Sequence, residues 1–343
     1  MAIQIETSFQ LDGYIESQIG GRAENQDSAG AMETPIGTVI VVCDGMGGMN
    51  GGKMASMLAV KTIIDKVSEA KRDDDPKEVL INAFQYAQNE ILSKASSDSN
   101  LKGMGTTATA IIVSKQCATV AHIGDSRIYQ LRRKKKIFRT NDHSMVYQLV
   151  AAGTLTEEQA RLSANSNIIL KALGVDGDAT PDIQKLPFLR GDRFVLCTDG
   201  FWSVYAEKDF IKLISKKGNL NDVLWNATKE INKQGIIAGG NHDNLTAAVF
   251  DIHCESKLKP HMSRRLKITL FSVLFSLIIS VFINIMLFKR VEQDSPRLNV
   301  AQEYVSALMD STNTIDLDKA KAKFIDAFWL IEEPSSNLSN IEK

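Results

Sequence analysis

The sequence predicts an α+β fold, in which antiparallel sheets are covered by helices, followed by one C-terminal transmembrane helix. Three observations lead to this prediction. Short apolar runs end in polar turns, longer stretches have helical spacing, and the run from 268 to 288 carries no charge. Strands come first, then two helices together, then strands and helices again. This order differs from the regular βαβα alternation of a doubly wound parallel sheet.

Buried strands are expected where β-branched and apolar residues run together and end in Asp, Gly or Asn. The predicted strands are Thr38–Cys43, Ala108–Val113, Ala118–Ile123, Phe194–Thr198 and Leu245–Phe250. Helices are expected where apolar residues recur every three or four positions. The predicted helices are Lys53–Ala70, Lys77–Lys94, Glu207–Ser215 and Leu220–Lys233. Residues 1–254 are therefore predicted to form one mixed domain.

Composition bounds the class of protein. The chain has 343 residues, of which 44% are hydrophobic, so it can bury a large core. A formal charge of −1 offers no global field for nucleic acid. We interpret the basic run Arg132–Lys136 as a solvated hairpin tip rather than a binding patch. The four cysteines form no CxxC pair, and no secretory signal peptide is visible, which indicates reduced thiols in a reducing compartment.

The C-terminal part changes character at residue 255. Residues 255–267 form a basic linker, residues 268–288 are uncharged, and residues 291–343 have the spacing of a short helical tail. About 20 apolar residues of helix span a bilayer, which favours a transmembrane helix over a buried core helix. The linker holds more basic residues than the first part of the tail, so the positive-inside rule places residues 1–254 in the cytoplasm and the tail outside it.

Five aspartates lie beside Gly, Asn or Ser, and most of them follow or precede a predicted strand. They are Asp27, Asp44, Asp125, Asp199 and Asp243. Any one of them could simply cap a turn. Strand ends gathered at one edge of a sheet would instead bring several carboxylates together, and their repulsion would then need a cation. Oxygen ligands without a His or Cys cluster favour Mg²⁺ or Mn²⁺ over Zn²⁺.

The segments around these aspartates resemble the metal-dependent PPM family of protein phosphatases, also called PP2C-like phosphatases, in its bacterial form. The resemblance covers residues 8–252. The matching segments, in order, are Arg22-Ala23-Glu24-Asn25-Gln26-Asp27, Asp44-Gly45-Met46-Gly47-Gly48, Gly105-Thr106-Thr107, Gly124-Asp125-Ser126-Arg127, Asp142-His143-Ser144, Lys171-Ala172-Leu173-Gly174, Thr198-Asp199-Gly200 and Asp243-Asn244.

The resemblance implies a four-layer αββα sandwich of two antiparallel β-sheets flanked by helices. It implies two Mn²⁺ or Mg²⁺ ions in a cleft at one end, with a weaker third ion. By this resemblance, Asp44 bridges both ions, Gly45 contributes its carbonyl, and Asp199 and Asp243 hold the first ion. Asp27 binds or orients metal-bound water, and Asp125 helps to hold the third ion. Arg22 holds the substrate phosphate.

The implied activity is hydrolysis of phosphoserine and phosphothreonine in proteins by a metal-activated water, which would reverse Ser/Thr kinase signalling. Two features depart from many relatives, since Gln26 replaces a Glu and Met46 replaces a His. The segment Ser144–Ala172 matches the mobile flap of bacterial members, but Ser163–Ser166 differ from the His-Pro-x-Arg sequence common there. Two alternatives are a phosphatase for a dedicated anti-sigma-type regulator and an inactive phosphoprotein-binding module, and the retained aspartates argue against the second.

Overall fold

The computed structural model describes residues 2–175, 177–259, 269 and 271–290. Residues 1–260 form one compact unit, called here the N-terminal unit, and the rest of the chain belongs to a second unit. Most of the predicted linker and the whole predicted tail at 291–343 lie outside the described residues.

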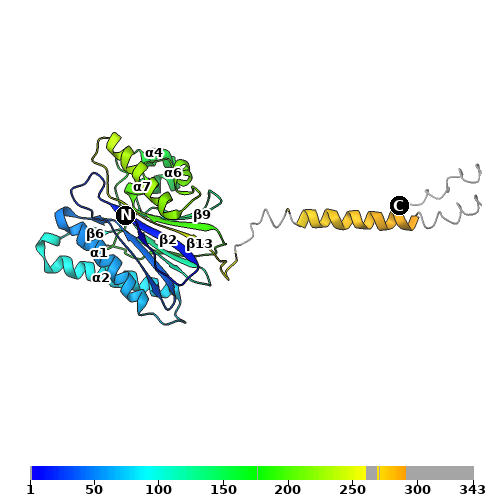
Figure 1. Cartoon of the computed structure of the whole chain (residues 1–343), viewed down its shortest axis with the longest axis horizontal. Helices are drawn as coiled ribbons and strands as arrows, with labels where there is room; N and C mark the ends of the chain where they lie inside the picture. Colours follow the sequence, from blue (N-terminus) through cyan, green and yellow to red (C-terminus); the bar gives the residue numbers. More distant parts are fainter. Residues whose placement is uncertain (1, 176, 260–268, 270, 291–343) are drawn as a thin grey trace, which may run out of the picture. The chain divides into compact units, whose positions relative to one another are not determined.

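The N-terminal unit contains two large sheets and one small one (Figure 1). The first sheet has the order β1 (Ile3–Gln4), β2 (Leu11–Gln18), β13 (Leu245–Ile252), β12 (Asp192–Cys197), β9 (Arg127–Arg132) and β10 (Lys135–Arg139). The second has the order β11 (Asp182–Leu186), β8 (Ala118–Ile123), β7 (Ala108–Val113), β4 (Gly37–Cys43) and β3 (Ser28–Thr34). The small sheet pairs β5 (Gly45–Met46) with β6 (Gly105–Thr106). Every pairing among the described strands is antiparallel, as predicted.

Helices cover the outer faces of both large sheets (Figure 1). The pair α1 (Gly48–Ser68) and α2 (Pro76–Ser97) packs on the second sheet, and α6 (Glu207–Ile214) and α7 (Leu220–Ile237) pack on the first. The shorter helices are η1 (Ser99–Leu101), α3 (Met145–Ala151), α4 (Glu157–Arg161) and α5 (Asp199–Trp202). Asp75 begins α2, because its side chain accepts the Lys77 backbone N–H and Pro76 occupies the first turn.

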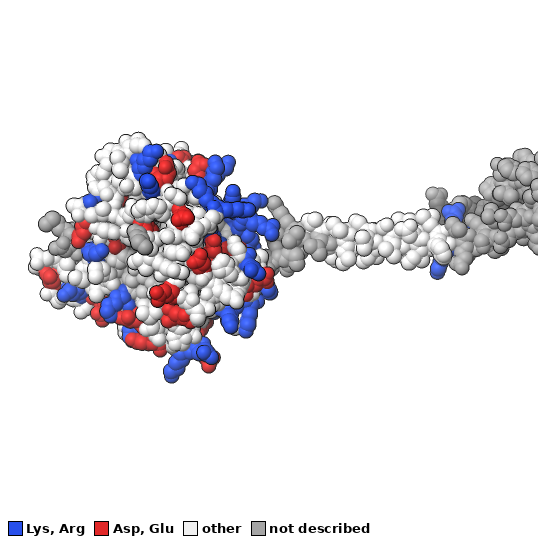
Figure 2. Space-filling view, viewed as in Figure 1, with Lys and Arg blue, Asp and Glu red and all other residues white. Residues whose placement is uncertain are grey.

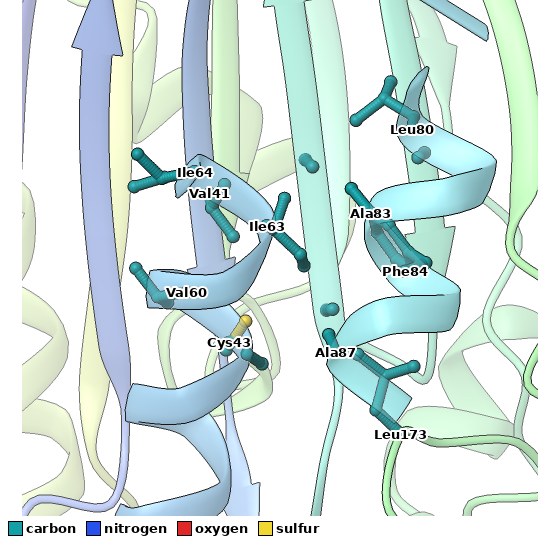
Figure 3. Close-up of a cluster of buried hydrophobic side chains, with 14 of the residues drawn as sticks. Val41, Cys43, Val60, Ile63, Ile64, Leu80, Ala83, Phe84, Ala87 and Leu173 are labelled. Carbon is teal, nitrogen blue, oxygen red and sulfur yellow. The ribbon is translucent and has the colours of Figure 1, made fainter. Parts of the chain in front are cut away.

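Three clusters of buried apolar side chains hold these elements together. Figure 3 shows the first, in which Val60 and Ile63 of α1 and Phe84 of α2 meet Val41 and other residues of the second sheet. A second cluster fills the space between the two sheets, and a third joins the first sheet to α6 and α7. Strands β4, β7 and β8 are therefore buried on both faces, which explains why they have continuous apolar sequences.

One end of the two sheets collects the strand ends that carry the predicted aspartates. Strand β4 ends one residue before Asp44, β8 ends two before Asp125, and β12 ends two before Asp199. Strand β13 begins two residues after Asp243. The antiparallel registers of β12 with β9 and β13 bring these ends from distant parts of the sequence to the same edge.

The predicted elements are confirmed, with differences in their ends. Helix α1 begins at Gly48 rather than Lys53, because packing against the second sheet outweighs the low helix propensity of its glycines. The basic run at 132–136 is a hairpin tip as predicted, with positive φ at Arg133 and Lys134. The described residues of the second unit form a helix over Phe271–Arg290 with a mean hydropathy of 2.5, long and apolar enough to cross a membrane.

Candidate active site

An open cleft of about 960 Å³ lies at the aspartate-bearing end of the sheets. Its lining includes every predicted site residue except Asp27: Arg22, Asp44, Gly45, Asp125, Asp199 and Asp243. The fold thus brings these residues together from five separate chain segments, as the strand-end argument requires.

The backbone of Asp44 is clamped by two threonines of the Gly105–Thr107 segment. The Asp44 N–H donates to Thr107 Oγ1 at 2.9 Å, and the Asp44 carbonyl accepts from Thr106 Oγ1 at 2.8 Å and from the Thr107 N–H at 2.9 Å. The next residue has to be glycine, because a Cβ on Gly45 would stand 2.1 Å from the Gly52 carbonyl oxygen of α1. Several glycines after Asp44 therefore serve the close packing of α1 against this turn, a role that the sequence did not reveal.

Asp243 and Arg22 form an ion pair at the mouth of the cleft. Arg22 Nη2 lies 2.9 Å from Asp243 Oδ2, and both side chains are partly exposed. Asn244 anchors the loop that carries Arg22. Its Oδ1 accepts the Gln26 N–H at 2.8 Å, and its Nδ2 donates to the carbonyls of Ile19 and Glu24. Asn244 is thus a positioning residue for the cleft rim.

Glu24 is a carboxylate of the cleft that the sequence did not identify. It lines the cleft beside Gln26, and its Oε2 is buried without a hydrogen-bond partner among the described residues. The loop therefore keeps a carboxylate in the cleft two positions before Gln26. Glu24 stands in the first matching segment, but its place in the cleft depends on the loop that Asn244 holds.

Asp27 lies beneath the cleft rather than in its lining. The side chain is only 3% exposed, and its Oδ2 accepts a hydrogen bond from Thr198 Oγ1 at 3.0 Å. Thr198 directly precedes Asp199, so Asp27 can orient that segment from behind. The structure places Asp27 close to the carboxylate cluster but does not bring it to the surface where substrate would enter.

The cluster carries negative charge that protein groups do not fully balance. Burial, together with the charge of Asp27, raises the pKa of Asp44 well above its usual range, and burial with Asp199 does the same for Asp125. Burial, with the charge of Asp243 next, raises the pKa of Asp199 to about 6. Burial raises the pKa of Asp27 to about 7 despite the hydrogen bonds from Thr246 and Thr198. Such shifts are typical of a functional site.

These residues fit hard divalent cations. Asp125 Oδ1 and Asp199 Oδ1 are buried and have no hydrogen-bond partner among the described residues, so each has a free acceptor. No group of three or more His, Cys, Asp or Glu side chains in the described part of the chain converges as an all-protein metal cage would. Mg²⁺ and similar ions retain several waters and need only one or two carboxylates, so the donor set suits them rather than Zn²⁺.

A smaller cavity of about 150 Å³ adjoins the cleft and shares Asp125, Asp199 and Asn167 with it. Its lining includes a cation–π pair, with the Arg127 guanidinium 3.2 Å from the centre of the Trp202 ring. Trp202 Nε1–H donates to the Asp125 carbonyl at 3.1 Å. The segment at 167–169, from the expected flap, lines the cleft on this side, so it can contact a bound substrate.

Comparisons with known proteins agree with this site. A sequence model described as protein phosphatase 2C matches residues 16–231. The serine/threonine phosphatase Stp of Listeria monocytogenes is 32% identical over 234 residues, which cover 67% of this chain and 91% of that protein.

Two solved structures are similar. The serine/threonine phosphatase of S. agalactiae has a TM-score of 0.64 at 29% identity, and the match covers 71% of this chain and 100% of the other. The catalytic domain of the phosphatase PstP, solved in complex with 2 manganese ions, has a TM-score of 0.59 at 29% identity over 71% of this chain and 98% of that domain. This chain therefore belongs to the protein phosphatase 2C family of serine/threonine protein phosphatases.

Proposed function

We propose that this chain is a membrane-anchored phosphatase that hydrolyses phosphoserine and phosphothreonine in cytoplasmic proteins with two Mn²⁺ or Mg²⁺ ions, and so opposes a Ser/Thr kinase. The observation that carries the proposal is the gathering of Asp44, Asp199 and Asp243 in one cleft beside Arg22. The uncompensated carboxylates support divalent ions, and the adjacent arginine supports a phosphate substrate. We also propose that the helices and sheets form the four-layer αββα sandwich of the family.

In the proposed mechanism, Asp44, Asp199, Asp243 and the Gly45 carbonyl would hold the two ions, and Asp125 would help to hold a weaker third. When bound, the ions supply an activated water and neutralise charge on the phosphoryl oxygens. The Arg22 guanidinium would bind those oxygens and orient the phosphate for in-line attack. The Thr106 and Thr107 hydrogen bonds would keep Asp44 in place. Asp27 would hold the Thr198–Asp199 segment through the hydrogen bond that it accepts from Thr198, and would bind or orient metal-bound water.

The test of the reaction is hydrolysis of a phosphothreonine peptide by residues 1–259. We expect turnover with Mn²⁺ or Mg²⁺ and none in excess EDTA, with activity restored when Mn²⁺ is added back. A phosphopeptide that binds but is never hydrolysed would favour the inactive binding module instead. Full activity in EDTA would exclude the metal-dependent reaction.

The membrane anchor leads to a separate expected result. The helix Phe271–Arg290 bears exposed apolar side chains, and the hydroxyls of Ser272 and Ser276 donate to carbonyls of the same segment, as a span in lipid requires. In intact spheroplasts, protease should remove a C-terminal epitope tag while the N-terminal unit survives. A protected tag would place the tail in the cytoplasm and contradict the orientation inferred from flanking charge.

A further inference from the structure

Basic side chains are concentrated at the end of the N-terminal unit opposite the cleft. Figure 2 shows Lys and Arg gathered on one side of the unit, on the right in this view. The residues, called here the basic end, are Lys115, Arg133, Lys134, Lys135, Arg190, Lys216, Lys217 and Lys257. All are exposed, and none forms an ion pair with another described residue.

The strand pairings place Arg133, Lys134 and Arg190 at the same end of neighbouring strands in the first sheet. Arg133 and Lys134 form the turn between β9 and β10. Strand β9 begins next to Asp125 in the cleft and ends at this turn, where Arg132 pairs with Asp192 at the start of β12. Arg190 precedes β12 in a loop whose Gly191 N–H donates to the Ile252 carbonyl at the end of β13, at 2.7 Å.

Further contacts bring the remaining lysines to the same end. The backbone N–H of Lys257 donates to the Lys115 carbonyl at 3.0 Å, in the β7–β8 turn. Arg193 Nη1, near the start of β12, donates to the Lys216 carbonyl at 3.2 Å. The turns of both sheets and the α6–α7 loop therefore contribute to one basic surface.

The carboxylates near this surface are mostly neutralised. Asp192 is held by Arg132 at 2.6 Å, Asp251 by Arg193 at 2.6 Å and Glu255 by Lys259 at 3.3 Å. Asp12 on β2 is the register partner of Asp251 and so also lies near this end, and Glu33, beside the β3–β4 turn, accepts a hydrogen bond from the Ser8 N–H. The exposed charge of the basic end is therefore strongly positive, although the whole chain has a net charge of −1.

We propose that the basic end docks on the anionic headgroups of the bilayer in which Phe271–Arg290 is inserted. The inference rests on the proposed membrane anchor. Chain continuity favours a lipid surface as the occupant, because the described part of the unit ends at Lys259, two residues after Lys257 of the basic end. The segment from there to Phe271 can reach at most about 40 Å, and its sequence adds Arg264, Arg265 and Lys267. Leu258, which is 41% exposed between two lysines, offers an apolar side chain to the interface.

Docking in this way would fix the direction in which the cleft opens. The cleft and the basic end lie at opposite ends of β9, β12 and β13, which are six to eight residues long. A strand of six residues spans about 20 Å. The cleft would therefore face the cytoplasm, away from the headgroups, and would accept phosphorylated segments of soluble proteins or of domains that project well beyond the bilayer.

The test is sedimentation of residues 1–259 with vesicles. The fragment is expected to fold alone, because relatives such as Stp consist almost entirely of this region. We expect binding to vesicles of phosphatidylcholine with one third phosphatidylglycerol, weakened by 0.5 M salt, and little binding to pure phosphatidylcholine. Each basic residue near an anionic surface strengthens binding about fivefold. The variant Lys134→Gln/Lys135→Gln/Arg190→Gln/Lys257→Gln should therefore bind several hundredfold more weakly, with unchanged phosphopeptide turnover in solution.

The matched control is Lys61→Gln/Lys94→Gln/Lys102→Gln/Lys208→Gln, which removes the same charge from exposed positions outside the basic end. An equal loss of binding in this control would overturn the proposal, as would equal binding to neutral vesicles. Tighter binding to a duplex RNA or DNA than to the anionic vesicles would assign the surface to nucleic acid instead. In the full chain in anionic nanodiscs, Lys134 and Lys257 should be protected from an amine-reactive reagent relative to Lys94 and Lys102. Equal labelling would contradict docking even if the anchor and the phosphatase activity are both confirmed.

Discussion

Asp44→Asn and Asp199→Asn are each expected to lower kcat for a phosphothreonine peptide by about 10³-fold or more at saturating Mn²⁺. An amide is a poor ligand for a hard cation, and a bound metal supplies several kcal/mol of transition-state stabilisation. Asp125→Asn should cost less, because its proposed ion is the weaker third. Steady-state kinetics of residues 1–259 measures all three effects.

The folded state of these variants provides the control. In EDTA, Asp44→Asn should have an equal or higher Tm than the parent, because a neutral amide replaces a carboxyl group whose charged form is disfavoured by burial and by the neighbouring aspartates. The exposed Asp73→Asn removes a carboxylate outside the cleft and should leave both kcat and Tm unchanged. Near-normal kcat in Asp44→Asn would show that Asp44 does not hold a catalytic ion.

Arg127→Ala is expected to destabilise the N-terminal unit by about 3–5 kcal/mol, because it leaves a buried charge without its partner. Arg127 Nε and Nη2 donate to the two Asp142 oxygens at 2.8 and 2.6 Å, and Nη1 donates to the Tyr129 hydroxyl at 3.1 Å. Both charged side chains are nearly buried, at 10% and 5% exposure. Denaturation in urea, in the presence of EDTA, gives the free energy of unfolding without a contribution from metal binding.

Two comparisons make this result specific. The double variant Arg127→Met/Asp142→Leu removes both charges and should recover part of the loss. Lys61→Ala breaks an exposed ion pair with Asp65 and should cost less than about 1 kcal/mol. A loss for Arg127→Ala as small as that for Lys61→Ala would mean that the buried pair contributes no more to stability than an exposed one.

The strands that could be predicted from the sequence are those whose side chains are buried on both faces of the sheet. Strands β4, β7 and β8 have apolar side chains on both faces, so their sequences alone identify them. The residues of edge strands β3 and β10 are half-exposed or exposed, and their sequences mix polar and apolar residues. These segments form strands because a neighbouring strand pairs with them. Such strands depend on contacts that no local pattern records.

The site was predictable to the extent that it lies in short motifs. The aspartates at strand ends could be found, because each follows or precedes an apolar run. Glu24, Asn244 and Trp202 could not be assigned their positions, since each depends on a loop or contact between distant segments. The position of Asp27 beneath the cleft likewise depends on Thr198, which is 171 residues away in the sequence.

Calorimetric titration of Mn²⁺ into residues 1–259 tests most directly whether the carboxylate cluster binds divalent ions. In the metal-free site the pKa of Asp199 is raised to about 6 and that of Asp27 to about 7, so below these pH values the ions must displace protons. We expect two ions to bind at pH 8, with weaker binding and proton release at pH 5.5, and a large loss of affinity in Asp44→Asn and Asp199→Asn. Mn²⁺ binding that is equal in the parent and both variants, and independent of pH, would contradict the account.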